Sequence, residues 1–204
     1  MYSSRSRSAP APFYETVKQD ICKKAEGWLV RLQGVGTFVA EPKGQSALFE
    51  VRSIAEEIAA RRHQHRCEVL TLERVRANAI QASALNVNES DVIFHSIMVH
   101  YENDLPVQIE DRCVNADIAV DYLTQDYSQT TPHAYLSRIA PLTEGEHIVE
   151  AVRATAQECA WLTIKEHEPC LLIRRTTWSA SRIVSHARLL FPGSRYRLQG
   201  RFIS

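Results

Sequence analysis

The chain has 204 residues, 45% of them hydrophobic, and its 24 Lys and Arg balance 24 Asp and Glu. This composition excludes wholesale disorder and a global positive field for nucleic acid, and no apolar run is long enough to span a membrane. The five scattered cysteines are an odd number without a Cys-x-x-Cys motif, which argues against a secreted disulfide framework. We therefore expect a cytoplasmic protein without membrane contact.

The first 46 residues predict a small, incomplete unit. Residues 1–11 have the composition of a flexible tail, and residues 13–24 place apolar side chains four apart, as in one short amphipathic helix. Two β-rich runs, 28–32 and 37–40, surround Gly34 and Gly36 and predict a hairpin whose tip tolerates positive φ. The segment "EPKGQS", residues 41–46, has linker composition.

The remainder predicts an α+β fold. Capping-box pairs at Ser53 and Glu56, at Asn78 and Gln81, and at Thr155 and Glu158 predict three helix starts. A further helix is expected near 132–139. Strands are predicted over 68–76, 92–101, 105–114, 147–154, 170–178, 183–191 and 196–203. Because most of these strands follow one another as hairpins, we expect a largely antiparallel sheet with short helices.

Alternation within the predicted strands groups polar side chains. Ser96, Met98 and His100 share one face of their strand. On the next strand Gln108, Glu110 and Arg112 share a face, and if the two faces coincide they form a patch of imidazole, amide, carboxylate and guanidinium groups. The alternative is an ordinary solvated sheet face, which antiparallel sheets often have. Farther along the chain, Arg174 is grouped with Thr176, and Ser185 with Ala187.

A metal site and a catalytic site are two other interpretations of the polar residues. In "HQHRC", residues 63–67, two imidazoles and a thiol would point one way from a strand, as zinc or copper requires. The flanking arginines and the lack of a second ligand cluster favour an exposed basic turn between a helix and a strand, so no metal or cofactor is expected. The sequence also contains no nucleophile elbow, phosphate-binding loop or dinucleotide fingerprint, and we expect no catalysis.

Residues 26–42, "EGWLVRLQGVGTFVAEP", carry a resemblance to a known family. This stretch resembles the wing of GntR-family transcriptional regulators, which it matches at Glu26, Gly27, Gln33, Gly34, Gly36, Thr37, Phe38 and Val39. Residues 13–24 are similar to the first DNA-binding helix of that family. From residue 47 onward the chain resembles the ligand-sensing UTRA domain of the branch that controls histidine utilisation. The resemblance implies a bacterial cytoplasmic repressor with a chorismate-lyase-like sensor fold, which binds operator DNA as a homodimer and is released by an effector.

The chain departs from the family between the first helix and the wing. Two family helices, including the one that reads the major groove, are absent, because Lys24 leads through Ala25 directly into Glu26. We therefore expect impaired operator binding, with Arg31, Gln33, Gly34 and Gly36 of the wing left for weak DNA contacts. The expected organisation is a tail over 1–11, an incomplete winged helix over 12–44, and an effector-binding and dimerisation domain over 45–204.

The branch implies urocanate, an imidazole joined to an acrylate, as the effector. Family positions on either side of the "NDLP" turn, residues 103–106, correspond to Met98, His100 and Glu110, and the arginines expected for a sugar phosphate are missing there. A carboxylate favours an arginine fork, an imidazole favours hydrogen-bonding partners, and the conjugated plane favours an aromatic wall. The effector-binding candidates are Met98, His100, Glu110, Arg112, Tyr135, Arg174, Ser185 and Phe191.

Two alternatives from other functional classes remain open at this point. The first is a small-molecule enzyme on the chorismate-lyase-like scaffold, since fold alone does not determine activity. The second is a dimerising partner of an intact repressor that does not itself bind DNA.

Overall fold

The computed structural model describes residues 29–32, 36–39, 44–47 and 52–199. The chain divides into two units, residues 1–42 and 43–204. In the first unit, β1 (Leu29–Leu32) and β2 (Gly36–Val39) pair antiparallel, with Leu29 opposite Val39. The predicted hairpin is thus confirmed, whereas the tail over 1–11 and the helix over 13–24 lie outside the described residues.

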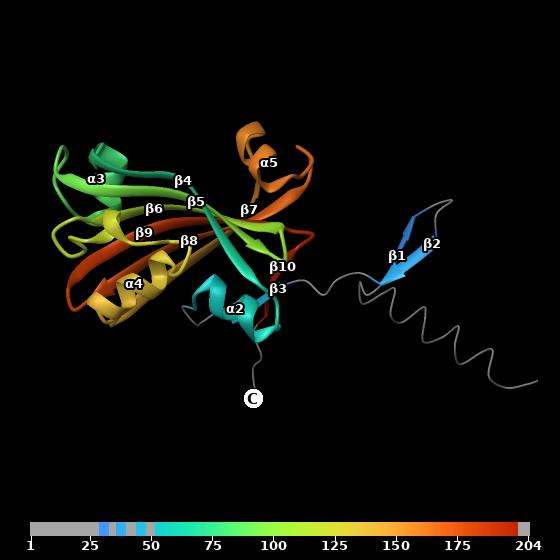
Figure 1. Cartoon of the computed structure of the whole chain (residues 1–204). Helices are drawn as coiled ribbons and strands as arrows, with labels where there is room; N and C mark the ends of the chain where they lie inside the picture. Colours follow the sequence, from blue (N-terminus) through green and yellow to red (C-terminus); the bar gives the residue numbers. More distant parts are fainter. Residues whose placement is uncertain (1–28, 33–35, 40–43, 48–51, 200–204) are drawn as a thin grey trace, which may run out of the picture. The chain divides into compact units, whose positions relative to one another are not determined.

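The second unit is built on a six-stranded antiparallel sheet, with strand order β4-β5-β6-β9-β8-β7 (Figure 1). The mostly antiparallel α+β fold expected from the sequence is therefore confirmed. The sheet strands are β4 (His65–Arg76), β5 (Val92–Glu102), β6 (Leu105–Asn115), β7 (Glu144–Arg153), β8 (Pro169–Ser179) and β9 (Arg182–Pro192).

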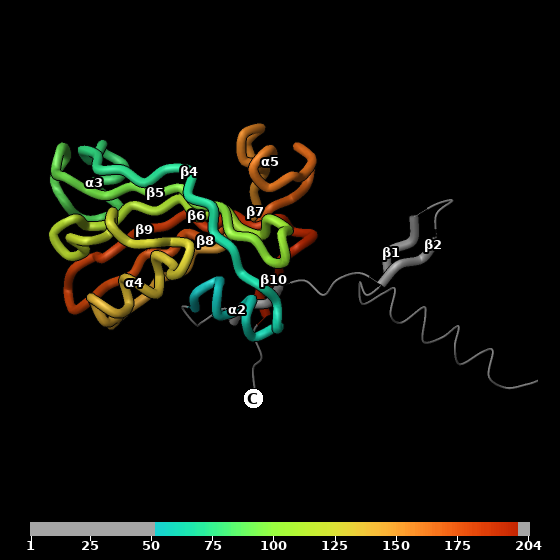
Figure 2. Tube along the Cα trace, in the orientation of Figure 1, coloured from blue at the N-terminus to red at the C-terminus, as the bar shows by residue number. Residues whose placement is uncertain are grey.

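Helices cover both faces of this sheet, as the chain trace shows (Figure 2). On one face α2 (Ile54–Ala60) packs against β8 and β9, and α4 (Pro132–Ile139) packs against β5 and β6. On the other face lie α3 (Ala79–Leu85) and α5 (Ala156–Leu162). The two covered faces give the sheet two apolar cores. No described helix is long and apolar enough to cross a membrane.

The predicted helix starts are confirmed because their signals are local. Ser53, Asn78 and Thr155 each cap a helix through a complete capping box. Each cap satisfies first-turn backbone donors that no helix can satisfy internally. The helix predicted near 132–139 is present over Pro132–Ile139 and begins at the Thr131 cap.

Strand boundaries differ from expectation where pairing with a distant segment decides them. β3 (Gly44–Ala47) lies within and just beyond the predicted linker, and it pairs in parallel with β10 (Tyr196–Gln199). β4 begins at His65 instead of residue 68, since His65 pairs with Glu102 on β5. Residues 200–203 of the last predicted strand lie outside the described residues.

Candidate functional site

The polar faces of β5 and β6 coincide. Met98 lies opposite Glu110, and His100 lies opposite Gln108. These side chains are at most 3% exposed, so the shared face is buried beneath helices and is not the solvated alternative. Buried polar groups on this scale are unusual for a purely structural core and mark the face as the candidate site.

Glu110 and Arg112 form a buried ion pair at the centre of this face. Arg112 Nε donates to Glu110 Oε1 at 2.7 Å, and Arg112 Nη1 donates to Ser185 Oγ at 2.6 Å. Burial opposes ionisation of Glu110, but the Arg112 charge and the neighbouring His100 outweigh it and hold the Glu110 pKa well below its usual range. The pair is therefore charged at neutral pH.

A second contact extends the polar group toward the edge strand β4. His65 Nε2 and His100 Nδ1 are 3.0 Å apart, and the two rings stack with centroids 5.3 Å apart. On its other side, His100 Nε2 lies 3.5 Å from Glu110 Oε2. The side chains of β4, β5 and β6 thus form one connected chain of polar contacts.

Three buried polar atoms of this face have no hydrogen-bond partner among the described residues. They are Gln108 Oε1, Arg112 Nη2 and His100 Nε2, whose 3.5 Å contact with Glu110 Oε2 is too long for a good hydrogen bond. Among the described residues, one further buried atom of this kind is Ser137 Oγ in α4. An unsatisfied buried polar atom costs about 1–3 kcal/mol. Their grouping on one face indicates hydrogen-bonding capacity that a ligand or ordered water can use.

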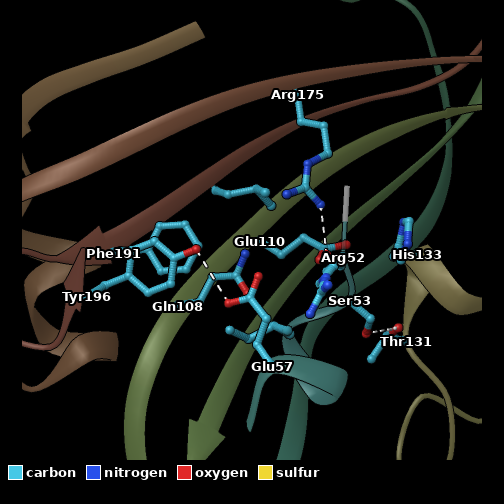
Figure 3. Close-up of a pocket in the computed structure, with 12 residues that line it drawn as sticks. Arg52, Ser53, Glu57, Gln108, Glu110, Thr131, His133, Arg175, Phe191 and Tyr196 are labelled. Atoms are coloured by element: carbon cyan, nitrogen blue, oxygen red, sulfur yellow. Dashed lines mark hydrogen bonds between the residues drawn. The ribbon is translucent and has the colours of Figure 1, made fainter. Parts of the chain in front are cut away.

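A cleft opens beside these atoms, between the sheet and the first turns of α2 and α4 (Figure 3). Its empty space is about 310 Å³ including the part open to solvent, but the enclosed part has room for about one water molecule. The cleft is therefore nearly closed. Its lining comes from the starts of α2 and α4 and from strands β6, β8, β9 and β10, and includes Ser53, Gln108, Glu110, Thr131, His133 and Arg175.

Arg175 is the buried cation of the cleft. It is 6% exposed, its Nε donates to His147 Nε2 at 2.8 Å, and its Nη1 donates to the Arg52 carbonyl oxygen at 3.2 Å. Burial and the nearby positive charge of Arg112 lower its pKa to about 10. Arg175 still carries a positive charge at neutral pH, inside a largely dehydrated site.

His133 supplies a neutral imidazole at the start of α4. Burial and the charges of Arg112 and Arg175 lower its pKa to about 4. The starts of the two covering helices are joined directly, because Ser53 Oγ and Thr131 Oγ1 lie 3.0 Å apart. Opening of the cleft must therefore separate contacts at these two helix starts.

The structure gathers six of the eight effector-binding candidates on or beside the cleft. Glu110 and Phe191 line it. Met98, His100, Arg112 and Ser185 are buried on the same sheet face.

Two candidates lie elsewhere. Tyr135 packs in the core, with its ring centroid 6.1 Å from that of Tyr122. Arg174 points to the opposite face, where its Nε donates to Glu150 Oε2 at 2.7 Å. The cleft is lined instead by the adjacent Arg175 and by His133, two residues before Tyr135.

The remaining sequence candidates have separate environments. Gln33 and Gly34 lie outside the described residues, while Arg31 and Gly36 belong to β1 and β2. In the "HQHRC" stretch, His63 Nδ1 lies 2.6 Å from Glu102 Oε1, whereas His65 contacts His100. Residues 65–67 belong to β4 and not to an exposed turn, so this part of the expectation was wrong.

Stability should fall as the pH drops from about 6.5 to about 4. Burial lowers the pKa of both His65 and His133 to about 4, while in the unfolded chain these groups titrate near 6.5. Between these values the unfolded state binds more protons, so acid favours unfolding. The lowered pKa of His186 acts in the same direction, and the raised pKa of His95 beside Asp111 opposes it.

Urea unfolding at pH 7 and pH 5 measures this effect. His133→Gln should reduce the loss of stability between the two values, and His167→Gln, at an exposed position, should leave the loss unchanged. Equal losses in wild type and His133→Gln would contradict the assignment of His133 as a half-buried neutral imidazole.

Comparison with known proteins identifies the family. The UTRA domain model matches residues 60–197. The chain is 64% identical over 239 residues to the histidine utilization repressor of Klebsiella aerogenes, covering 99% of each chain, and 64% identical over 180 residues to that of Pseudomonas aeruginosa, covering 88% of this chain and 72% of the relative. Because the first match spans 239 positions and this chain has 204, at least 35 positions of the Klebsiella protein have no counterpart here.

Solved structures agree with this relationship. The C-terminal domain of the histidine utilization repressor from Pseudomonas syringae pv. tomato is 57% identical, with a TM-score of 0.67, over 69% of this chain and all of that chain. PhnF from Mycobacterium smegmatis shares the fold, with a TM-score of 0.76 at 21% identity over 93% of this chain and 85% of that chain. The chain therefore belongs to the UTRA-domain family and, within it, to the histidine utilization repressors, which are transcriptional repressors.

Proposed function

We propose that this chain senses urocanate in the cleft beneath α2 and α4 and that this binding controls repression of histidine utilisation genes. The observation that carries the proposal is the combination of a buried cation, Arg175, with partnerless polar atoms on the adjoining sheet face. A ligand that suits this combination is small and carries one negative charge together with hydrogen-bonding groups. The names of the Klebsiella and Pseudomonas relatives support histidine utilisation as the process.

Each part of urocanate has a counterpart in the cleft. Its carboxylate suits an arginine, since charge-assisted bonds are stronger than neutral ones. Its imidazole N–H suits the Glu110 carboxylate or the partnerless Gln108 Oε1. Its conjugated plane suits the wall made by Phe191 and Tyr196, whose rings stack with centroids 3.8 Å apart.

Isothermal titration calorimetry of the full chain with urocanate tests the proposal. We expect saturable binding with a Kd between about 1 μM and 1 mM, or about −8 to −4 kcal/mol. A sugar phosphate of similar size serves as the control and should give no saturable heat, because Arg175 is the one buried arginine among the described residues that line the cleft. Absence of urocanate binding across this range would contradict the sensor assignment.

We further propose that the chain is a cytoplasmic homodimer with impaired operator binding. The missing positions relative to the Klebsiella protein support a loss of the DNA-reading helices at the junction of Lys24, Ala25 and Glu26. Without a recognition helix, the wing supplies mainly phosphate contacts.

A second proposed function for a dimer that binds DNA poorly is to pair with an intact repressor. When co-expressed with an intact histidine utilization repressor, this chain should form mixed dimers and weaken repression. Sedimentation of the purified mixture distinguishes mixed from separate dimers. Exclusive self-association would remove this function.

A further inference from the structure

Arg175 has no carboxylate counter-ion among the described residues, in contrast to Arg112, Arg174 and Arg188 on the same three strands, β6, β8 and β9. Arg112, Arg174 and Arg188 each lie within 3.3 Å of a carboxylate oxygen. Arg175 forms no ion pair with a carboxylate among the described residues, although it is 6% exposed. The charges of Glu110 and Glu57 favour the Arg175 cation without forming an ion pair with it, but burial and the charge of Arg112 outweigh them. This position therefore favours an additional anion from outside the chain.

The surroundings of Arg175 leave room and donors for such an anion. Only two of its five N–H donors are used among the described residues, both on neutral acceptors, His147 Nε2 and the Arg52 carbonyl. On the sheet, Ala187 lies between Arg112 and Arg175 in one row across β6, β9 and β8. Ala187 is fully buried in the apolar core and does not line the cleft, so a small apolar side chain separates the two guanidinium groups.

The bond to the Arg52 carbonyl connects this cation to the start of α2. Arg52 directly precedes the Ser53 cap, and both residues line the cleft. Ser53 also contacts Thr131 at the start of α4. Because the cleft is nearly closed, a ligand that enters must displace contacts of this kind.

We infer that Arg175 anchors the carboxylate of the effector and that binding exchanges its hydrogen bond with the Arg52 carbonyl for one with the ligand. The exchange is favourable because a carboxylate is a stronger acceptor for a guanidinium than a backbone carbonyl is. Its consequence is a loosened first turn of α2, in the segment of chain that leads back toward the β1–β2 hairpin. This inference rests on the proposed function for the identity of the ligand and adds the residue that selects its charge.

Arg175→Gln and Arg174→Gln form a matched pair of variants for the test. They change neighbouring arginines on opposite faces of the same strand, and only Arg175 lines the cleft. In calorimetry with urocanate, Arg175→Gln should weaken binding about 10- to 100-fold, the usual loss for a hydrogen bond to a charged group. Arg174→Gln should stay within about twofold of wild type.

Urocanamide, the neutral amide of the same acid, separates charge recognition from general damage to the site. Arg175→Gln should bind urocanamide as well as wild type does, and it should unfold in urea at the same or a higher concentration, because an unpaired buried charge has been removed. Without ligand, amide exchange over residues 52–60 should be faster in Arg175→Gln than in wild type or Arg174→Gln.

The outcomes separate this inference from the proposed function. If wild type binds urocanate and Arg175→Gln binds it equally well, the anchor assignment is wrong while the sensor assignment stands. If wild type does not bind urocanate, thermal shifts with benzoate and nicotinate against their amides test the anchor independently. Stabilisation of wild type by the acids alone, lost in Arg175→Gln, supports the anchor, and no stabilisation by any of these acids overturns it.

Discussion

Glu110→Ala is expected to lower the free energy of unfolding by about 3–5 kcal/mol, whereas Glu150→Ala should lower it by at most about 1 kcal/mol. Both substitutions remove a carboxylate that accepts a hydrogen bond from an arginine Nε at 2.7 Å. The two pairs differ in burial, since the side chains of Glu110 and Arg112 are 5% and 2% exposed and those of Glu150 and Arg174 are 43% and 40% exposed.

The physical reason for the difference is the arginine left behind. Without Glu110, Arg112 retains a charge in a dehydrated core, and the Ser185 hydroxyl is its remaining side-chain hydrogen-bond partner among the described residues. Without Glu150, Arg174 is solvated. Urea unfolding at pH 7 measures both changes, and similar losses for the two variants would contradict a buried ionic centre for this sheet face.

The second large effect concerns DNA. In gel-shift titrations at about 0.15 M salt, the chain should bind a histidine utilisation operator no better than a scrambled duplex, with a non-specific Kd of about 10⁻⁴ to 10⁻⁶ M. Specific repressors bind their sites at least about 10³-fold more tightly than other DNA. The expected loss of discrimination follows from the proposed loss of the helix that would hold side chains against base edges in the major groove.

An insertion variant provides the matched control for this experiment. The positions of the Klebsiella protein that have no counterpart here can be inserted between Lys24 and Glu26, and discrimination between operator and scrambled DNA should return. A sharp, operator-specific shift by the unmodified chain at the same salt concentration would show that the remaining segments suffice for recognition.

The elements of this fold that could be predicted from the sequence are those specified by local signals. A capping box places its hydrogen-bond partners within four residues, so the starts of α2, α3 and α5 could be predicted. The two-residue period of a strand likewise placed Glu110 and Arg112 on one face, and the structure pairs them. β3 had no such signal, because its partner β10 lies about 150 residues later in the chain and tertiary pairing determines it.

The candidate site required information that strand alternation does not contain. Leu172 and Ile173 are both 2% exposed, since helices cover both faces of the sheet, so the pattern before Arg174 and Arg175 does not indicate which arginine faces the cleft. Tyr135 and His133 present a similar difficulty, because residues two apart on a helix point in nearly opposite directions. One side of α4 therefore packs Tyr135 into the core, and the opposite side brings His133 to the cleft.

A structure of the full chain with urocanate tests the central claim most directly. We predict that the ligand lies between the sheet and the first turns of α2 and α4, with a carboxylate oxygen about 3 Å from the Arg175 guanidinium and the imidazole toward Glu110 and Gln108. Urocanate bound outside this cleft, or bound within it while Arg175 keeps its hydrogen bond to the Arg52 carbonyl, would contradict the account.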